Sequence, residues 1–370
     1  MAGIYIHIPF CFSRCGYCDF YKTTKLDKLE PFLVALKSEI KHYSSLFQEK
    51  ITTLYFGGGT PSLLKSSHFN EIFSLLRDSY IFSERIEITI ECNPDDLTKD
   101  YIDKLLESGF NRISIGIQSF HEKDLQEMGR RHSSAQALQA IKDAYSGGFR
   151  NIGMDLIYGL PWSNTAAFSE NLKIVKTLPI NHLSAYHLTF EEGTPFDRLL
   201  KRGVYREITD SESLNQYELL REFAAKEGFE HYEVSNFCKP GFRSRHNSSY
   251  WDGSPYIGFG PGSHSYFGGY RQWNKADLNL YLKSDREKIV EKEVLDISDR
   301  LNELIMLGLR TAEGVNLEAI EALDRQMYNK VVSASKKWLQ AGNLHNESKF
   351  LKCNAKSWFV VDGIIKDLFV

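Results

Sequence analysis

The sequence has few cysteines and no long apolar run. Six of its 370 residues are cysteine and three of these lie between positions 11 and 18, so a disulfide framework is not expected. No apolar run approaches the about 20 residues that cross a bilayer, and the first residues lack the basic segment and apolar core of a secretory signal. These absences predict a protein of the reducing cytoplasm that does not itself span a membrane.

The sequence also lacks an excess of charge of either sign. It carries 45 Lys and Arg residues against 48 Asp and Glu residues, for a net charge of −3, so nucleic acid is not expected as a partner. Internal repeats and low-complexity segments are absent, which argues against a disordered linker. A chain of 370 residues with 42% hydrophobic residues is long and apolar enough for one large domain and a smaller one that contact each other.

Three cysteines form a C-x3-C-x2-C run at Cys11, Cys15 and Cys18. Thiolates at this spacing can hold three corners of a [4Fe–4S] cluster and leave one iron without a protein ligand, open to a substrate. A zinc site is the alternative, but structural zinc takes four Cys or His ligands, often in paired C-x2-C units. The other cysteines stand alone along the chain, and His7 is expected to be a buried strand residue rather than a ligand. The spacing therefore favours the cluster.

Between residue 3 and about residue 190, short β-rich segments alternate with amphipathic helical segments. The predicted strands are 3–8, 51–56, 86–91, 112–118, 151–157 and 182–188. The predicted helices between them are 29–46, 69–76, 99–107, 134–145 and 166–177. Alternation of this kind predicts a parallel sheet with crossover helices that forms a barrel or most of one. An open, doubly wound sheet is the competing geometry.

Distinctive residues stand at the carboxyl ends of five predicted strands. The cysteine run follows the first strand, and the glycines and threonine of 57–60 follow the second. Glu91, Gln118 and Asp155 stand at or near the ends of the next three. In a parallel barrel these strand ends meet at one mouth, where binding and catalytic groups collect. The sequence therefore predicts one shared site at the mouth.

The pattern changes after about residue 190. From about residue 295, predicted helices at 299–310, 317–323 and 326–341 precede two short strands near Phe350 and Trp358 and a terminal helix around Ile364. Helices followed by a hairpin predict a small α+β unit of winged-helix type. We therefore expect a core barrel at 1–230, an aromatic and Gly-rich extension at 231–290, and a C-terminal domain at 291–370.

Five motifs occur in order along the chain: YIHIPFC, FGGGTPS, IECNP, RISIGIQSF and DLIYGLP. Together with the cysteine spacing they resemble the family of oxygen-independent coproporphyrinogen III dehydrogenases and haem chaperones, in the radical S-adenosylmethionine (SAM) superfamily. The resemblance implies an α/β fold: a partial (β/α)6 barrel followed by a small C-terminal domain.

The resemblance also implies the cofactor ligands. Cys11, Cys15 and Cys18 would hold a [4Fe–4S] cluster. The residues implied to bind SAM are Tyr5, Tyr17, Gly58, Gly59, Thr60, Glu91, Gln118, Arg130 and Asp155. From its position alone, Arg130 would instead be a solvated surface residue.

Two features bear on which branch of the family the chain resembles. Dehydrogenases carry a further cysteine two places after the third, where this chain has Phe20, and residues 246–251 match an H-N-x-x-Y-W motif of the chaperone branch. The resemblance thus implies a chaperone that binds haem and passes it to an apo-haemoprotein, which we expect to be a membrane-associated respiratory protein. The alternative is the dehydrogenase, a radical enzyme. Cleavage of SAM in either would need a reductant such as a flavodoxin.

His246 is the candidate haem ligand. An imidazole flanked by Tyr250 and Trp251 can ligate iron while the aromatic rings lie against the macrocycle. The alternative, of equal weight, is a structural histidine whose neighbours hold the barrel against the second domain. His264 and Cys238 are weaker candidates.

Overall fold

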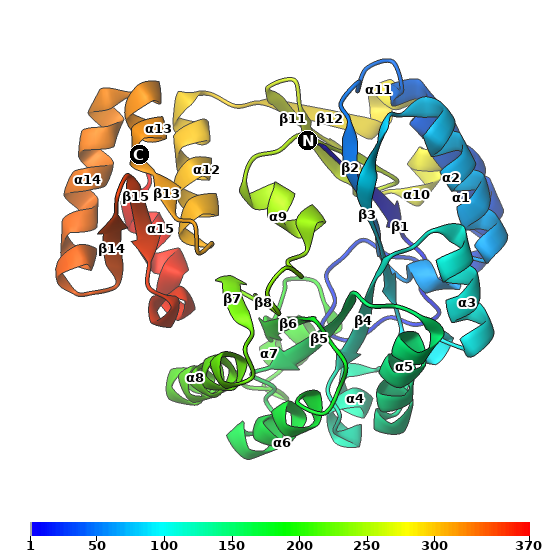
Figure 1. Cartoon of the computed structure of the whole chain (residues 1–370), viewed down its shortest axis with the longest axis horizontal. Helices are drawn as coiled ribbons and strands as arrows, with labels where there is room; N and C mark the ends of the chain where they lie inside the picture. The colour runs from blue at the N-terminus through cyan, green and yellow to red at the C-terminus, as the bar shows by residue number, and fades with distance from the viewer. Residues whose placement is uncertain (1) are drawn as a thin grey trace.

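The computed structural model describes residues 2–370, and its centre is a curved sheet of six parallel strands that lie side by side in chain order. These strands are β1 (Ala2–Ile8), β2 (Ile51–Gly58), β3 (Phe82–Cys92), β4 (Arg112–Gln118), β5 (Ile152–Tyr158) and β6 (His182–His187). A doubly wound sheet reverses its strand order at a switch point, and this order runs without reversal. The predicted partial barrel is therefore confirmed, with its crossover helices on the outer side (Figure 1).

The crossover helices are α1 (Leu29–Tyr43), α2 (Ser66–Ser79), α3 (Lys99–Ser108), α4 (Glu122–Met128), α5 (Ser134–Gly147) and α6 (Thr165–Val175). They bury apolar faces against the sheet. Phe56 of β2, for example, meets the edges of Phe69 and Phe73 of α2 with ring centroids 5.3 and 5.6 Å apart. The sequence pattern did not predict α4, because its seven residues are too few to show helical periodicity.

Further strands lengthen the sheet on both sides. β9 (Tyr256–Phe259) pairs parallel with β1, and β10 (His264–Phe267), β11 (Tyr270–Asn274) and β12 (Val290–Val294) continue that side in antiparallel fashion. On the other side β8 (Asn236–Cys238) and β7 (Glu230–Glu233) follow β6. The helices of this part are α7 (Pro195–Lys201), α8 (Asp210–Lys226), α9 (Arg245–Trp251), α10 (Leu278–Leu282) and α11 (Arg286–Ile289). The limits 1–230, 231–290 and 291–370 stay predictions.

A buried carboxylate fastens the β9 side of the sheet to the first helix. Glu39 of α1 is 0% exposed, and its Oε1 lies 3.0 Å from Nη1 of Arg286. It also accepts hydrogen bonds from the side chain of Asn274, the backbone N–H of Gly260 and the hydroxyl of Tyr281. A buried charge is tolerated only when it is paired and hydrogen-bonded in this way. The extension after residue 255 is therefore held firmly against the barrel.

The C-terminal domain has the predicted winged-helix layout of helices followed by a hairpin. Its elements are α12 (Ile297–Leu309), β13 (Val315–Asn316), α13 (Leu317–Leu323), α14 (Arg325–Gln340), β14 (Leu344–Glu347), β15 (Phe350–Cys353) and α15 (Val361–Leu368), with sheet order β13-β15-β14. The predicted strand near Trp358 is wrong. Trp358 lies in the 3-10 helix η4 (Ala355–Val360), where its indole N–H donates to the carbonyl of Leu309 at 2.8 Å and its ring is buried.

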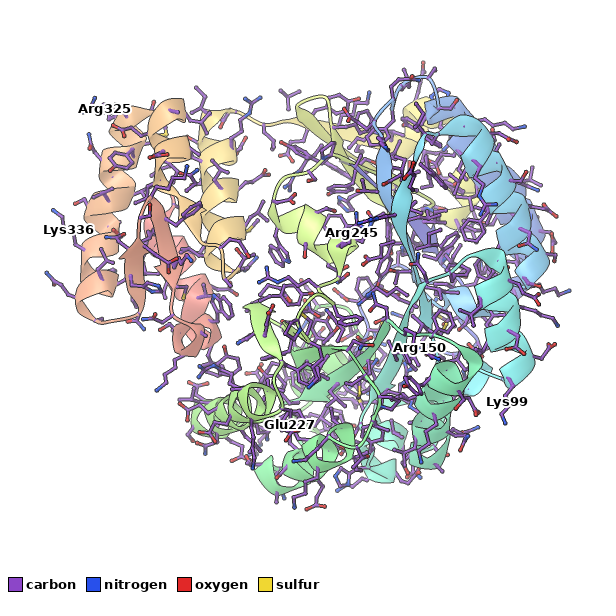
Figure 2. All side chains as sticks on the ribbon, in the orientation of Figure 1. Lys99, Arg150, Glu227, Arg245, Arg325 and Lys336 are labelled. Atoms are coloured by element: carbon purple, nitrogen blue, oxygen red, sulfur yellow. The ribbon has the colours of Figure 1, made fainter. Side chains whose placement is uncertain are left out.

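Charged side chains such as Lys99, Arg325 and Lys336 are exposed and point away from the molecule (Figure 2). Within the described residues 2–370, no helix is both long enough and apolar enough to cross a membrane.

Candidate functional site

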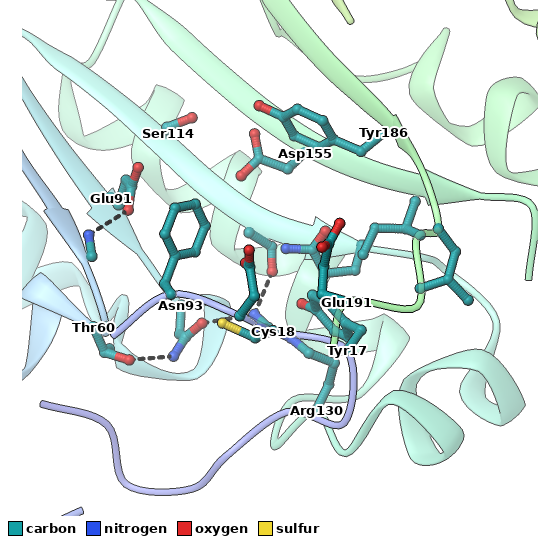
Figure 3. Close-up of a pocket in the computed structure, with 18 of the residues that line it drawn as sticks. Tyr17, Cys18, Thr60, Glu91, Asn93, Ser114, Arg130, Asp155, Tyr186 and Glu191 are labelled. Atoms are coloured by element: carbon teal, nitrogen blue, oxygen red, sulfur yellow. Dashed lines mark hydrogen bonds between the residues drawn. The ribbon is translucent and has the colours of Figure 1, made fainter. Parts of the chain in front are cut away.

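The carboxyl ends of the parallel strands surround a cavity of about 360 Å³. Most of the predicted site residues line it: Tyr17, Cys18, Gly58, Gly59, Thr60, Glu91, Gln118, Arg130 and Asp155. Figure 3 shows how Glu91, Asp155 and Arg130 come from different elements to one space. Cys11 and Cys15 line a small adjoining cavity of about 60 Å³ together with Cys18. The structure thus gathers every predicted site residue around one place except Tyr5 and His246.

The three cysteines lie on the loop that follows β1, and neighbouring side chains donate hydrogen bonds to two of them. The hydroxyl of Thr60 donates to the sulfur of Cys11 at 3.4 Å. One guanidinium N–H of Arg130 donates to the sulfur of Cys15 at 3.5 Å. Donors aimed at sulfur stabilise the negative charge of a ligating thiolate. All three cysteines are free thiols.

This donor set fits an iron–sulfur cluster better than a single metal ion. In the part of the chain that the structure describes, no three His, Cys, Asp or Glu side chains are close enough together to hold one ion. His7 offers no fourth ligand, because its Nε2 lies 2.8 Å from the carbonyl of Tyr21 and its Nδ1 lies 3.1 Å from the hydroxyl of Tyr5. A cubane has room for three thiolates spread around a wider space, and it needs no fourth protein ligand when one iron stays open.

Two glycines at the end of β2 make close contacts, Gly58 with the ring of His7 and Gly59 with the start of the cysteine loop. A Cβ on Gly59 would stand 2.7 Å from the carbonyl oxygen of Phe10, closer than real Cβ atoms approach, and 3.0 Å from the sulfur of Cys11. Gly58 has φ +109°, which disfavours any side chain there. The Gly-rich turn after β2 is therefore required by close contact with the loop that carries the cysteines.

Two half-buried carboxyls, those of Glu91 and Asp155, form the opposite wall of the cavity. Glu91 accepts from the hydroxyl of Tyr55 at 2.7 Å and from the backbone N–H of Gly58 at 3.2 Å. Burial raises the pKa of Glu91 to about 7, although these two hydrogen bonds act to lower it. Burial likewise raises the pKa of Asp155 to about 6. The buried guanidinium of Arg112 opposes both shifts, and its Nε and Nη1 have no hydrogen-bond partner.

Arg130 is held inside the site and is not a solvated surface residue. Its Nη2 donates to the side-chain oxygen of Asn93 and to the carbonyl of Gly116, both at 2.7 Å. Gln118, at the end of β4, has φ +69°, a strained conformation for a residue with a side chain. Backbone strain of this kind gathers at functional sites, where the surroundings hold it in place.

Tyr5 and His246 lie beneath the cavity and not in its wall. The ring of Tyr5 stands against Gly57, whose added Cβ would come within 3.0 Å of it. The ring of His246 is 1% exposed, with Nδ1 2.8 Å from the hydroxyl of Thr53 and Nε2 2.9 Å from the hydroxyl of Tyr250. Burial lowers the pKa of His246 to about 3. To ligate iron, this histidine would have to leave a buried, fully hydrogen-bonded position, so its role as haem ligand stays a prediction.

Several cavity residues were not predicted from the sequence: Asn93, Ser114, Tyr186, His187 and Glu191. Asn93 directly follows the end of β3, the same signal that identified Glu91 and Gln118. Tyr186 stands near the end of β6, where the same reasoning could have found it. Ser114 lies mid-strand, and only the alternation of β4 side chains could have placed it toward the barrel interior.

Comparison with known proteins identifies the family. The sequence profile of the Radical SAM superfamily matches residues 5–173, and that of the HemN C-terminal domain matches residues 295–360. The chain is 36% identical to the heme chaperone HemW of Lactococcus lactis, over 86% of this chain and 83% of that protein. It is 32% identical to the heme chaperone HemW of Bacillus subtilis, over 94% of this chain and 93% of that protein. The chain belongs to the HemW family.

The fold agrees with this assignment. The structure matches that of coproporphyrinogen III oxidase (HemN) from Escherichia coli with a TM-score of 0.87, over 100% of this chain and 90% of that chain. At 23% sequence identity this likeness shows the shared fold. Membership of the HemW family, within the Radical SAM superfamily, implies a [4Fe–4S] cluster and SAM as cofactors, and the cysteine loop and the mouth cavity fit these two groups.

Proposed function

We propose that this chain is a haem chaperone, which binds haem and transfers it to apo-haemoproteins. The observation that carries the proposal is its identity of 32–36% with proteins named heme chaperone HemW, over most of their length and of its own. Phe20 supports the proposal, because the dehydrogenases that this chain resembles have a cysteine at the position of Phe20. Its ring is 64% exposed beside the mouth cavity, where it offers no thiolate.

Within this function, Cys11, Cys15 and Cys18 hold the [4Fe–4S] cluster. When bound, such a cluster supplies an iron without a protein ligand, at which the amino and carboxylate groups of SAM can be chelated. Thr60 and Arg130 donate hydrogen bonds toward the ligating sulfurs and orient them. The close approach of Gly59 keeps the cysteine loop at the edge of the mouth cavity.

The mouth cavity binds SAM. Its carboxyls Glu91 and Asp155 would accept hydrogen bonds from hydroxyl groups of the ligand, and Arg130, which donates to the sulfur of Cys15, would pair with its carboxylate. The further residues assigned to this site are Tyr17, Gly58, Gly59, Thr60 and Gln118. Tyr5 acts as a positioning residue, since it supports the backbone of Gly57 and does not line the cavity.

Transfer of haem tests the proposed function directly. The reconstituted protein is loaded with haem anaerobically, freed of excess haem and mixed with an affinity-tagged apo-cytochrome b. The two proteins are then separated and the haem in each is measured. We expect haem to reach the cytochrome faster from this protein than from serum albumin at the same haem concentration. The C11A/C15A/C18A variant shows whether the cluster governs the rate.

Two outcomes would overturn the proposal. One is transfer no faster than from albumin. The other is catalytic decarboxylation of coproporphyrinogen III by the reconstituted protein with SAM and a strong reductant, which would make the chain a dehydrogenase. The natural recipient, expected to be a membrane-associated respiratory haemoprotein, and a flavodoxin-type reductant both stay predictions.

A further inference from the structure

Arg112 is a buried cation, and two of its nitrogens lack hydrogen-bond partners. It is the first residue of β4, and its side chain is 1% exposed. Among the described residues 2–370, neither its Nε nor its Nη1 finds an acceptor. A buried charge of this kind is costly unless other groups compensate it. Arg112 does not line the mouth cavity, so any effect of its charge on that cavity acts through neighbouring side chains.

The guanidinium of Arg112 lies directly beneath the wall of the mouth cavity. Alternate residues of a strand share a face, so Arg112 and Ser114 both project into the barrel. Ser114 lines the cavity and pairs in register with Glu91 of β3 and Gly153 of β5. A Cβ on Gly153 would stand 3.2 Å from Nη2 of Arg112 and 3.2 Å from the hydroxyl of Ser114. Gly153 therefore leaves room for the guanidinium below Asp155, which follows two residues later on the same face of β5.

Two further buried carboxyls near the barrel interior have hydrogen-bond donors of their own. Glu87 of β3 accepts hydrogen bonds from the first two backbone N–H groups of α9, at 3.3 and 3.1 Å. Glu233 of β7 accepts one from the backbone N–H of Ser235 at 3.3 Å. Of these four carboxyls, only Glu91 and Asp155 line the mouth cavity, into which both project (Figure 3).

The tyrosines, thiols and histidines around these side chains are uncharged near pH 7. Burial raises the pKa of the tyrosines and thiols and lowers the pKa of the histidines. The tyrosines are Tyr5, Tyr17, Tyr55, Tyr186, Tyr232 and Tyr250. The thiols are Cys92 and Cys238, and the histidines are His182 and His246. The other cation, Arg130, already donates to Asn93, Gly116 and Cys15. Arg112 is thus the unpaired positive charge beside Glu91 and Asp155.

We propose that Arg112 is a positioning residue of the SAM site, whose charge keeps Glu91 and Asp155 ionised so that both accept hydrogen bonds from the hydroxyl groups of the ligand. This inference rests on the proposed function, because it concerns the cofactor site of the same chaperone. A direct ion pair would occupy the carboxylate oxygens that the ligand needs, whereas a cation one layer below leaves them free. A guanidinium suits this role because it stays charged throughout the working pH range of a protein.

The pH dependence of SAM affinity tests this role, by calorimetry on reconstituted samples with equal iron per chain. The affinity of the wild type should rise with pH as Glu91 ionises around pH 7. Arg112→Met removes the charge, which should raise the pKa of this carboxyl by about one unit. The variant should therefore bind SAM about tenfold more weakly than the wild type at about pH 6 and almost equally well at about pH 9. The ratio of the two affinities at each pH cancels the titration of SAM itself.

Two controls separate charge from packing. Arg112→Lys keeps a positive charge and should restore the pH profile of the wild type. Arg150→Met removes an exposed arginine outside the mouth cavity and should leave the profile unchanged. If Arg112→Met does not fold, the uncharged variant Arg112→Gln gives the same comparison.

Three outcomes would overturn the proposal. The first is weaker binding by the same factor at every pH, in Arg112→Lys as in Arg112→Met, which would show a merely structural role. The second is a profile for the uncharged variant that equals that of the wild type. The third is the absence of SAM binding by the wild type, which would also remove the mouth cavity as the SAM site. Failure of haem transfer with the expected profiles intact would instead overturn the chaperone function and leave the role of Arg112 standing.

Discussion

Glu91→Gln should make the protein more stable at neutral pH while impairing its cofactor site. The carboxyl of Glu91 is held by the hydroxyl of Tyr55 and the backbone N–H of Gly58, yet burial keeps its pKa near 7. An unfolded chain ionises the same group near 4.5. The ionised form that would accept hydrogen bonds from a ligand is therefore costly in the folded, ligand-free protein.

The magnitude follows from linkage between protonation and folding. Between pH 4.5 and about 7 the unfolded chain has lost the proton while the folded protein still holds it, so stability falls as pH rises through this window. A pKa difference of this size corresponds to about 3 kcal/mol once both states are ionised. Glutamine does not titrate. Relative to wild type, Glu91→Gln should therefore gain about 2.5 kcal/mol in free energy of unfolding between about pH 5 and about pH 8.

Urea denaturation of wild type and variant at several pH values, on protein without bound cofactors, measures this difference. A difference between the two proteins that stays constant from about pH 5 to about pH 8 would refute the reasoning. Tyr55→Phe is the matched variant. It removes one donor from the carboxylate, so it should raise the pKa of Glu91 further and extend the loss of stability to higher pH. The affinity of the Glu91→Gln variant for SAM, measured by calorimetry, should be lower than that of the wild type.

Two further substitutions test close contacts seen in the structure. Gly59→Ala places a methyl group 2.7 Å from a backbone carbonyl and 3.0 Å from the sulfur of Cys11, so it should cost about 2 kcal/mol in urea denaturation and lower the iron bound per chain after reconstitution. The control is Gly363→Ala, in open space within a helix, which should stabilise the protein by about 0.5–1 kcal/mol. Equal effects of the two substitutions would contradict the close contact at Gly59. Glu39→Gln removes the buried charge that pairs with half-buried Arg286, and it should cost about 3 kcal/mol or more in the same assay. A loss below about 1 kcal/mol would show that the pair does not hold the extension in place.

The barrel could be predicted from the sequence because each of its strands is visible as a short, local run of apolar residues. Period-two apolar runs and the helices between them fall close to the observed elements, and the predicted strand at 112–118 has the observed limits of β4. Misplaced elements have physical reasons. Trp358 looks like a strand residue because it is large and aromatic, but its burial against Leu309 places it in a 3-10 turn. Only the tertiary contact, which no local pattern reveals, decides between the two.

The same distinction applies to the site. Cys11, Glu91 and Asp155 could be identified because the chemistry of a cysteine run, or of an acid at a strand end, is visible in a few adjacent letters. Arg130 could not be placed from a local pattern. By its position in the sequence it would be a solvated surface residue, and only its hydrogen bonds to the side chain of Asn93 and the carbonyl of Gly116 hold it in the cavity.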